Sequence, residues 1–183
     1  MIDDFRDKGF FNQSDKRLKI PEAYGVTVIS RDLISEGIDF APDSVDAFTC
    51  FDAMEHWHNS PKALFHELMK ALRPGGVLLI GGPNCANLRK RLMLLLGRAK
   101  WTSMEDWYEA PVFHSHVREP DVDDLLYIAR DLKLDSVRVF GRNWHFLKGA
   151  PPSLQPVAAL ADISLRPFPS LCGDIYLLGH KKQ

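Results

Sequence analysis

The residues best suited to chemistry lie together in one short segment of the chain. Asp52, Glu55 and His56 stand at spacings of three and four, so a helical turn there would point their side chains in one direction. An imidazole with a pKa near neutrality can accept a proton from a hydroxyl nucleophile, and a neighbouring carboxylate can orient its ring. We therefore take His56 and Glu55 as candidate catalytic residues, with packing of His56 as the alternative.

The elements that must position these side chains are those of an α/β sheet. The segment 45–51 is a nearly continuous apolar run, which predicts a strand covered on both faces. Short links between strand and helix patterns favour a parallel sheet with crossover helices. The predicted strands are 26–30, 45–51, 77–82, 136–140 and 174–179, the predicted helices are 61–72 and one from Pro120, and the proline-rich stretch 149–171 is expected to cross the surface.

Several polar residues follow directly after these predicted strands. Ligands bind in an open parallel sheet beyond the carboxyl ends of its strands. The residues that fall there are Asp32, Asp52, Glu55, His56, Pro83 and Asn84.

Bulk properties fit one cytoplasmic domain of 183 residues with a formal net charge of -1. This charge gives no general reason to expect a nucleic-acid partner, and no apolar run is long enough to predict a transmembrane segment. The acidic amino terminus is not a secretory signal, and the three separated cysteines form no zinc or disulfide pattern.

Four segments together resemble the class I S-adenosylmethionine (SAM)-dependent methyltransferases of the type 11 and type 12 domain family. They are Arg31–Leu33, Phe40–Asp46, Glu55-His56 and Leu72–Gly76. The resemblance covers about residues 26–140. It implies a partial doubly wound, Rossmann-like sheet that is mostly parallel with an antiparallel last strand, and transfer of a methyl group to an oxygen, nitrogen or carbon acceptor.

The resemblance also suggests roles for single residues. It implies that Asp32 accepts from the adenine amino group, that the backbone of Leu33 meets the ring, and that Phe51 and Asp52 lie by the methionine part of SAM. The alternative for Asp32 is a carboxylate that caps a turn.

The acceptor side of the site is implied in the same way. Asn84 and His116 are the expected substrate contacts. Leu95–Arg98 and His116–Arg118 are similar to motifs in methyltransferases of bacterial surface-glycan clusters, which implies a glycan, lipid-linked or small-molecule acceptor.

A metal site is the less favoured interpretation of the same residues. Asp52, Glu55, His56 and His116 are similar to the metal-binding constellation of small-RNA 2′-O-methyltransferases, with Asp52 in place of a glutamate. Two carboxylates and two imidazoles suit Mg²⁺ or Mn²⁺. Glu-His is also common in family members without a known metal, so we expect none here.

The sequence departs from the family at its amino-terminal end. No G-x-G-x-G turn lies before residue 26, and that turn normally lets the backbone approach the cofactor. We therefore expect SAM binding by this chain to be weak or lost, and 1–183 to be one amino-terminally truncated domain. A non-catalytic methyltransferase-like module is the alternative. We expect 26–30 to pair beside 45–51, with a partner chain at that sheet edge as the other way to cover it.

Residues 84–118 form a candidate lid or substrate-binding insertion. Its basic, leucine-rich part, 87–100, is interpreted either as a lid that touches phosphate or a lipid surface, or as an ordinary amphipathic helix on the sheet. Trp101, Trp107 and Tyr108 are candidates for an acceptor pocket, with core packing as the alternative.

Overall fold

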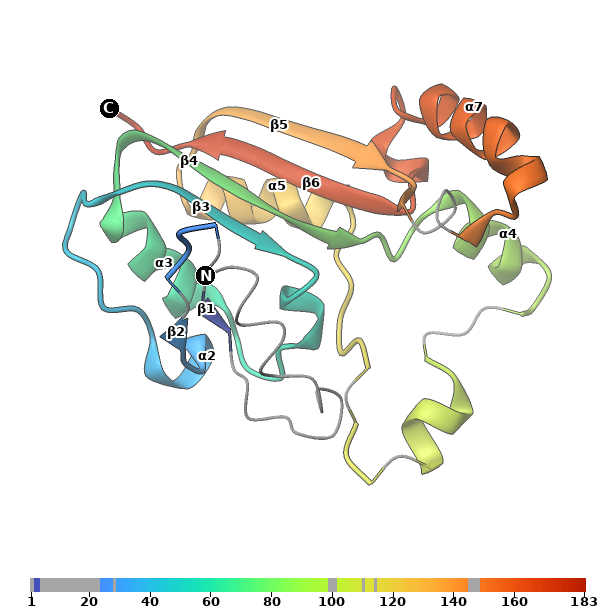
Figure 1. Cartoon of the computed structure of the whole chain (residues 1–183), viewed down its shortest axis with the longest axis horizontal. Helices are drawn as coiled ribbons and strands as arrows, with labels where there is room; N and C mark the ends of the chain where they lie inside the picture. Colours follow the sequence, from blue (N-terminus) through green and yellow to red (C-terminus); the bar gives the residue numbers. More distant parts are fainter. Residues whose placement is uncertain are drawn as a thin grey trace.

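The computed structural model describes residues 2–3, 24–27, 29–98, 102–109, 111–113, 115–144 and 149–183. Its centre is a four-stranded mixed sheet with the strand order β3-β4-β6-β5 (Figure 1). The strands are β3 (Val45–Phe51), β4 (Leu72–Pro83), β5 (Asp135–Arg142) and β6 (Asp174–His180). This arrangement confirms the predicted partial Rossmann-like fold.

The parallel half of the sheet forms as the sequence predicts. β3 and β4 are adjacent and parallel, and their register runs from Ala47 opposite Val77 to Phe51 opposite Gly81. Helix α3 (Lys62–Ala71) connects them. Leu64, Phe65 and Leu68 lie on one face of α3 at spacings of one and three, and all three are buried.

The antiparallel half adds the two carboxy-terminal strands. β6 pairs antiparallel with β4 on one side and with β5 on the other. Helix α5 (Val122–Asp131) precedes β5 and begins with a capping box, in which Asp121 and Asp124 each accept from the backbone N–H of the other. The expected antiparallel last strand is therefore confirmed.

One hydrophobic core joins α3 and α5 to the same face of the sheet. Leu78 and Ile80 of β4 and Ile175 and Leu177 of β6 are at most 1% exposed and belong to this cluster. Because side chains alternate along a strand, Phe51, Tyr176 and Phe140 fall on the opposite face. Their rings form a ladder across the sheet, with centroid distances of 5.7 Å and 5.4 Å.

The expected position of residues 26–30 is wrong. Ile29–Ser30 forms β2, which pairs parallel with β1 (Ile2–Asp3) in a separate two-stranded sheet. Within the described residues β3 pairs with β4 alone; Val45, Phe48 and Cys50 are half-buried against the core, and the other side chains of the strand are exposed. The apolar run of β3 indicated a strand, but it did not show that both faces are covered.

The proline-rich stretch, which was expected to cross the surface, is mostly exposed and partly helical. It contains α7 (Gln155–Leu165) between the short helices η3 (Pro152–Leu154) and η4 (Pro169–Leu171). Pro156 lies in the first turn of α7, where the missing N–H costs no helical hydrogen bond. A proline at this position starts a helix instead of breaking it.

The remaining described helices are short. They are α2 (Leu33–Glu36), η1 (Met54–His56), α4 (Leu88–Leu95) and η2 (Glu105–Glu109). In the described part of the chain, no helix has the length and apolar character needed to cross a membrane. The helix considered for residues 1–20 lies outside the described residues except at 2–3.

Candidate functional site

The candidate site begins where β3 ends. Asp52 follows the strand with a φ of 49°, a left-handed conformation that aspartate tolerates better than most residues, and its N–H donates to the carbonyl of Gly81 at 3.0 Å. This turn leads directly into η1. Glu55, in the middle of η1, is directed inward toward β4 and is 1% exposed.

The carboxyl group of Glu55 lies against the backbone of Gly82. A side-chain carbon at residue 82 would approach Glu55 Oε2 to 3.1 Å, so the glycine makes room for the carboxylate. Within the described residues Oε2 has no hydrogen-bond partner. Burial raises the pKa of Glu55; the negative charges of Asp52 and Glu119 act in the same direction, and a backbone hydrogen bond and His116 oppose it.

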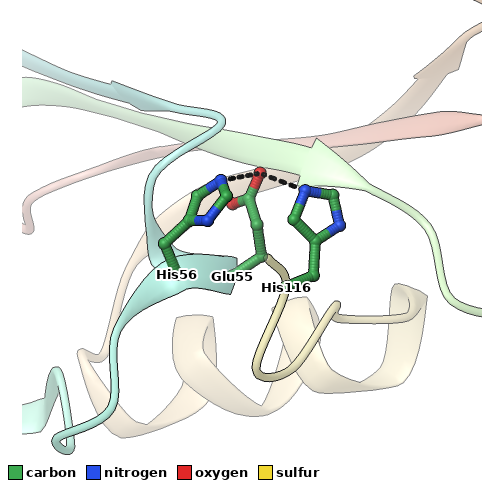
Figure 2. Close-up of side chains that lie close together, drawn as sticks. All are labelled: Glu55, His56 and His116. Atoms are coloured by element: carbon green, nitrogen blue, oxygen red, sulfur yellow. Dashed lines mark ion pairs between the residues drawn. The ribbon is translucent and has the colours of Figure 1, made fainter. Parts of the chain in front are cut away.

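Two histidines flank this carboxylate (Figure 2). The Nε2 atoms of His56 and His116 each lie 4.0 Å from Glu55 Oε1, and the two rings meet edge to face with centroids 4.8 Å apart. His56 comes from η1, and His116 comes from the segment before α5. A separation of 4.0 Å is too long for a hydrogen bond, so attraction requires a protonated ring.

His116 is held by both backbone and side-chain contacts. The backbone N–H groups of Val117 and Arg118 donate to the carbonyl of Glu55 at 2.7 Å and 3.2 Å. Nδ1 of His116 lies 2.7 Å from Oε1 of Glu119, which also forms an ion pair with Lys90 of α4. A neutral ring that donates from Nδ1 leaves Nε2 as an acceptor facing Glu55.

The arrangement can serve proton transfer or hold a cation. Glu55, His56 and His116 each offer one ligand atom, and these atoms lie within 4.8 Å of one another. Asp52 is not a member of this group, so the four-residue set considered from the sequence reduces to three among the described residues. Zinc with two histidines and one carboxylate has this donor chemistry.

Cys50, two residues before Asp52, is not a reactive thiol. Burial raises its pKa to about 12, and the negative charges of Glu55 and Asp52 add to the shift. The thiol is therefore protonated at neutral pH and does not act as a nucleophile.

The residues predicted to meet the cofactor are distributed over two elements. Asp32 is the N-cap of α2 and accepts from the backbone N–H groups of Ile34 and Ser35 at 3.0 Å and 3.4 Å. Leu33 packs against the core. Phe51, at the end of β3, is 45% exposed, and Asp52 beside it is also exposed. Their contact with SAM stays a prediction.

Asn84 has a structural role in this fold. It is fully buried, and its Nδ2 donates to the carbonyls of Ser170 and Cys172 while its Oδ1 accepts from the N–H of Ala86. These bonds tie the end of β4 to η4. We therefore leave Asn84 out of the proposed acceptor site.

Three site residues were missed from the sequence: Gly82, Lys90 and Glu119. The signal for Glu119 was its position three residues after His116, which allows an acid to reach the ring. Lys90 is 29 residues from Glu119, so no local pattern predicts their pairing.

The basic, leucine-rich helix of the candidate lid, α4, is exposed and not packed on the sheet. No residue of α4 is buried, which contradicts the interpretation of an ordinary amphipathic helix on the sheet. Trp107 and Tyr108 of η2 are 62% and 72% exposed, so they do not belong to the core. Trp101 lies outside the described residues.

Comparisons with known proteins agree with this fold. Residues 9–80 match the model of a methyltransferase domain family. A comparison of the sequence with curated proteins gives no significant match.

Solved structures with a similar fold are SAM-dependent methyltransferases. One from Thermotoga maritima has a TM-score of 0.59 at 18% identity, over 92% of this chain and 70% of that one. One from Archaeoglobus fulgidus has a TM-score of 0.53 at 13% identity, over 98% and 85%.

A third is phosphoethanolamine N-methyltransferase 2 of Haemonchus contortus in complex with SAM, with a TM-score of 0.52 at 15% identity. The match covers 92% of this chain and 40% of that one. In both its matched domain model and its fold, the chain resembles the class I SAM-dependent methyltransferases.

Proposed function

We propose that this chain provides the acceptor-facing part of a SAM-dependent methyltransferase that modifies an oxygen, nitrogen or carbon atom of a glycan, lipid-linked or small-molecule acceptor. The observation that carries the proposal is the cluster of Glu55, His56 and His116 beyond the carboxyl ends of β3 and β4. Ligands bind at this edge of an open α/β sheet.

The chain's own residues supply positioning and proton transfer. Nε2 of His116 accepts a hydrogen bond from the acceptor, and His56 takes the proton that the acceptor loses. Glu55, 4.0 Å away, stabilises the imidazolium that results. Alignment of the acceptor with the methyl group contributes much of the rate in such reactions.

The cofactor side fits SAM in part. SAM supplies an electrophilic methyl group when bound. Phe51 and Asp52 are accessible at the end of β3 and suit its methionine part, while Asp32 would meet the adenine beside the N-cap of α2. Gly9 and Gly25 are the only glycines before residue 26, so these residues contain no glycine turn to cradle the ribose and methionine.

Calorimetry with SAM and S-adenosylhomocysteine tests the proposal. We expect saturable but weak binding, with a dissociation constant well above the roughly micromolar values of tight sites. Asp52→Ala should weaken binding further. Asp46→Ala, which removes an exposed carboxylate near the opposite end of β3, is the matched control and should leave SAM binding unchanged.

Complete absence of binding at millimolar SAM would contradict this function. It would favour the second candidate, a non-catalytic methyltransferase-like module, for which the lack of a glycine turn within residues 1–25 is the specific observation. The edge of β3, which pairs with β4 alone among the described residues, would then offer a site for a partner chain. Sub-micromolar SAM binding would count against the module.

A further inference from the structure

Helix α4 and the turn that follows it present apolar side chains to solvent. The segment lies beyond the carboxyl end of β4, at the same end of the molecule as α7 (Figure 1). Leu92, Leu95 and Leu96 are 49%, 82% and 65% exposed. Exposed leucines at this density on one short helix indicate a surface that contacts something apolar.

Four of the five leucines from residue 88 to residue 96 lie on one side of the helix, and Leu94, which is 68% exposed, lies on the other side. Leu88, Leu92, Leu95 and Leu96 have spacings of four, three and one, which places them on a single face. Residues 87–98 carry four positive charges and no negative charge, although the whole chain has a net charge of -1. The basic residues are Arg89, Lys90, Arg91 and Arg98.

Two of these cations attach the helix to the body of the protein. Lys90 forms an ion pair with Glu119, and Arg91 donates to the carbonyls of Ala86 and Ser170. The contacts hold α4 in a fixed orientation. Arg89 and Arg98 are exposed, so their charges add to the leucine face.

Positive charge distinguishes the leucine face of α4 from the other exposed apolar surfaces. α7 exposes Val157, Leu160 and Ile163 without a basic residue between Gln155 and Leu165, and η2 carries three acidic residues beside Trp107 and Tyr108. Only α4 among the three combines leucines with positive charge. This combination fits a helix that lies in the plane of an anionic bilayer surface.

We propose that α4 docks the protein on an anionic lipid membrane, with Leu92, Leu95 and Leu96 in the acyl boundary and Arg89 and Arg98 on the headgroups. The docking does not depend on methyl transfer. It has a direct consequence for the site, because Lys90 of α4 is connected through Glu119 to His116. A membrane-bound acceptor would enter on the side of the protein that carries this connection.

Co-sedimentation with vesicles tests the docking. The 183-residue protein should bind vesicles of phosphatidylglycerol and phosphatidylcholine, bind pure phosphatidylcholine much less, and lose binding as salt is raised. The double variant Arg89→Glu/Arg98→Glu should bind the anionic vesicles at least about tenfold more weakly, since each basic residue near the surface contributes about fivefold.

Leucine variants test the apolar part. Leu96→Glu should weaken vesicle binding by about tenfold or more, because burying a charge opposes insertion. Leu160→Glu is the matched control, since Leu160 and Leu96 are both 65% exposed and α7 lacks the basic residues. Both sites are on the surface, and far-ultraviolet circular dichroism should show unchanged helix content.

Three outcomes would overturn the proposal. One is equal binding to anionic and neutral vesicles. A second is an equal effect of Leu160→Glu and Leu96→Glu, which would indicate unspecific apolar adsorption. The third is no vesicle binding together with a dimer on a sizing column that Leu96→Glu dissociates, which would make α4 a contact between two copies of the chain.

Discussion

Two carboxylates in this protein are equally buried and have opposite surroundings. Glu55 and Asp162 are each 1% exposed. Asp162, on α7, accepts from the backbone N–H and the side-chain amide of Asn143 at 3.0 Å and 3.1 Å, and from Nε and Nη2 of Arg166 at 2.9 Å and 2.5 Å. Both of its oxygens are therefore satisfied.

The difference appears in the pKa values. Burial would raise the pKa of Asp162, but the bonds from Arg166 and Asn143 outweigh it and the pKa is lowered. Burial does raise the pKa of Glu55, whose Oε2 has no hydrogen-bond partner within the described residues. A satisfied buried acid stabilises a fold, whereas an incompletely satisfied one beside two histidines suits a site that gains and loses charge.

The largest expected effect is on turnover, and it comes from a change beside Glu55. In a preparation that transfers methyl, His56→Ala should lower turnover by about 10²–10⁴-fold because a general base is lost. The free energy of unfolding should change little, since the side chain of His56 is 42% exposed. Transfer of a radiolabelled methyl group from SAM measures the first and urea denaturation the second.

His58→Ala provides the control for this experiment. His58 is exposed and two residues away, with its ring 6.5 Å from that of Phe113 and not beside Glu55. Its removal should leave turnover unchanged. Equal effects of the two variants would mean that His56 has no specific chemical role.

The next largest effect is on the free energy of unfolding, and it comes from a change at Asp162. Asp162→Ala should lower the free energy of unfolding by about 2–3 kcal/mol, because it leaves the N–H and amide of Asn143 without an acceptor and Arg166 without its partner. Asp46→Ala removes an exposed ion pair with Arg73 and should cost no more than about 0.5 kcal/mol. A loss below about 1 kcal/mol for Asp162→Ala would show that its network is not structural.

Local patterns in the sequence predicted the elements that surround Glu55. The apolar runs of 45–51 and 77–82 and the helix pattern of 61–72 were enough for the β3-α3-β4 unit, because neighbours in sequence determine each element. Glu55 and His56 are adjacent in the chain, so their chemistry was visible in the same way. His116 was proposed through the resemblance, and the structure brings it to Glu55.

The remainder depends on contacts between distant residues. Asp162 and Asn143 are 19 positions apart, and nothing in α7 alone marks its acid as buried. The apolar composition of β3 could not show which strand lies beside it, so 26–30 was placed wrongly. The prolines of 149–171 indicated a surface segment, and the helix that begins beside Pro156 was not predicted because the position of this proline relative to a helix start was not known.

Glu55→Gln should have a smaller effect on the free energy of unfolding than Asp162→Ala, and it should raise that free energy instead of lowering it. Folding raises the pKa of Glu55, so the folded protein binds the proton more tightly than the unfolded chain, and stability falls as pH rises through the folded pKa. The neutral amide should remove this loss. We expect the variant to be more stable than the parent by on the order of 1 kcal/mol at pH 8 and nearly equal at about pH 4.

Thermal unfolding of both proteins across this pH range measures the difference. Asp162→Asn should show the reverse pH dependence. Folding lowers the pKa of Asp162, so the ionised carboxylate contributes stability above the unfolded pKa of about 3.9, and this contribution is lost in acid. If Glu55→Gln were the less stable protein at pH 8, the ionised carboxylate would be satisfied and the contrast with Asp162 would disappear.

The smallest expected effect comes from the backbone beneath Glu55. An added methyl at Gly82 would lie 3.1 Å from Glu55 Oε2, and a side chain can move by the few tenths of an ångström required. Gly82→Ala should therefore cost less than about 1 kcal/mol. At Gly81 the methyl would meet the backbone carbonyl of Ile175 at 2.4 Å, which cannot move without breaking the pairing of β4 and β6, so Gly81→Ala should cost clearly more. Urea denaturation of the two variants decides whether the space at Gly82 belongs to the carboxylate: equal losses would mean that strand packing, and not Glu55, requires the glycine.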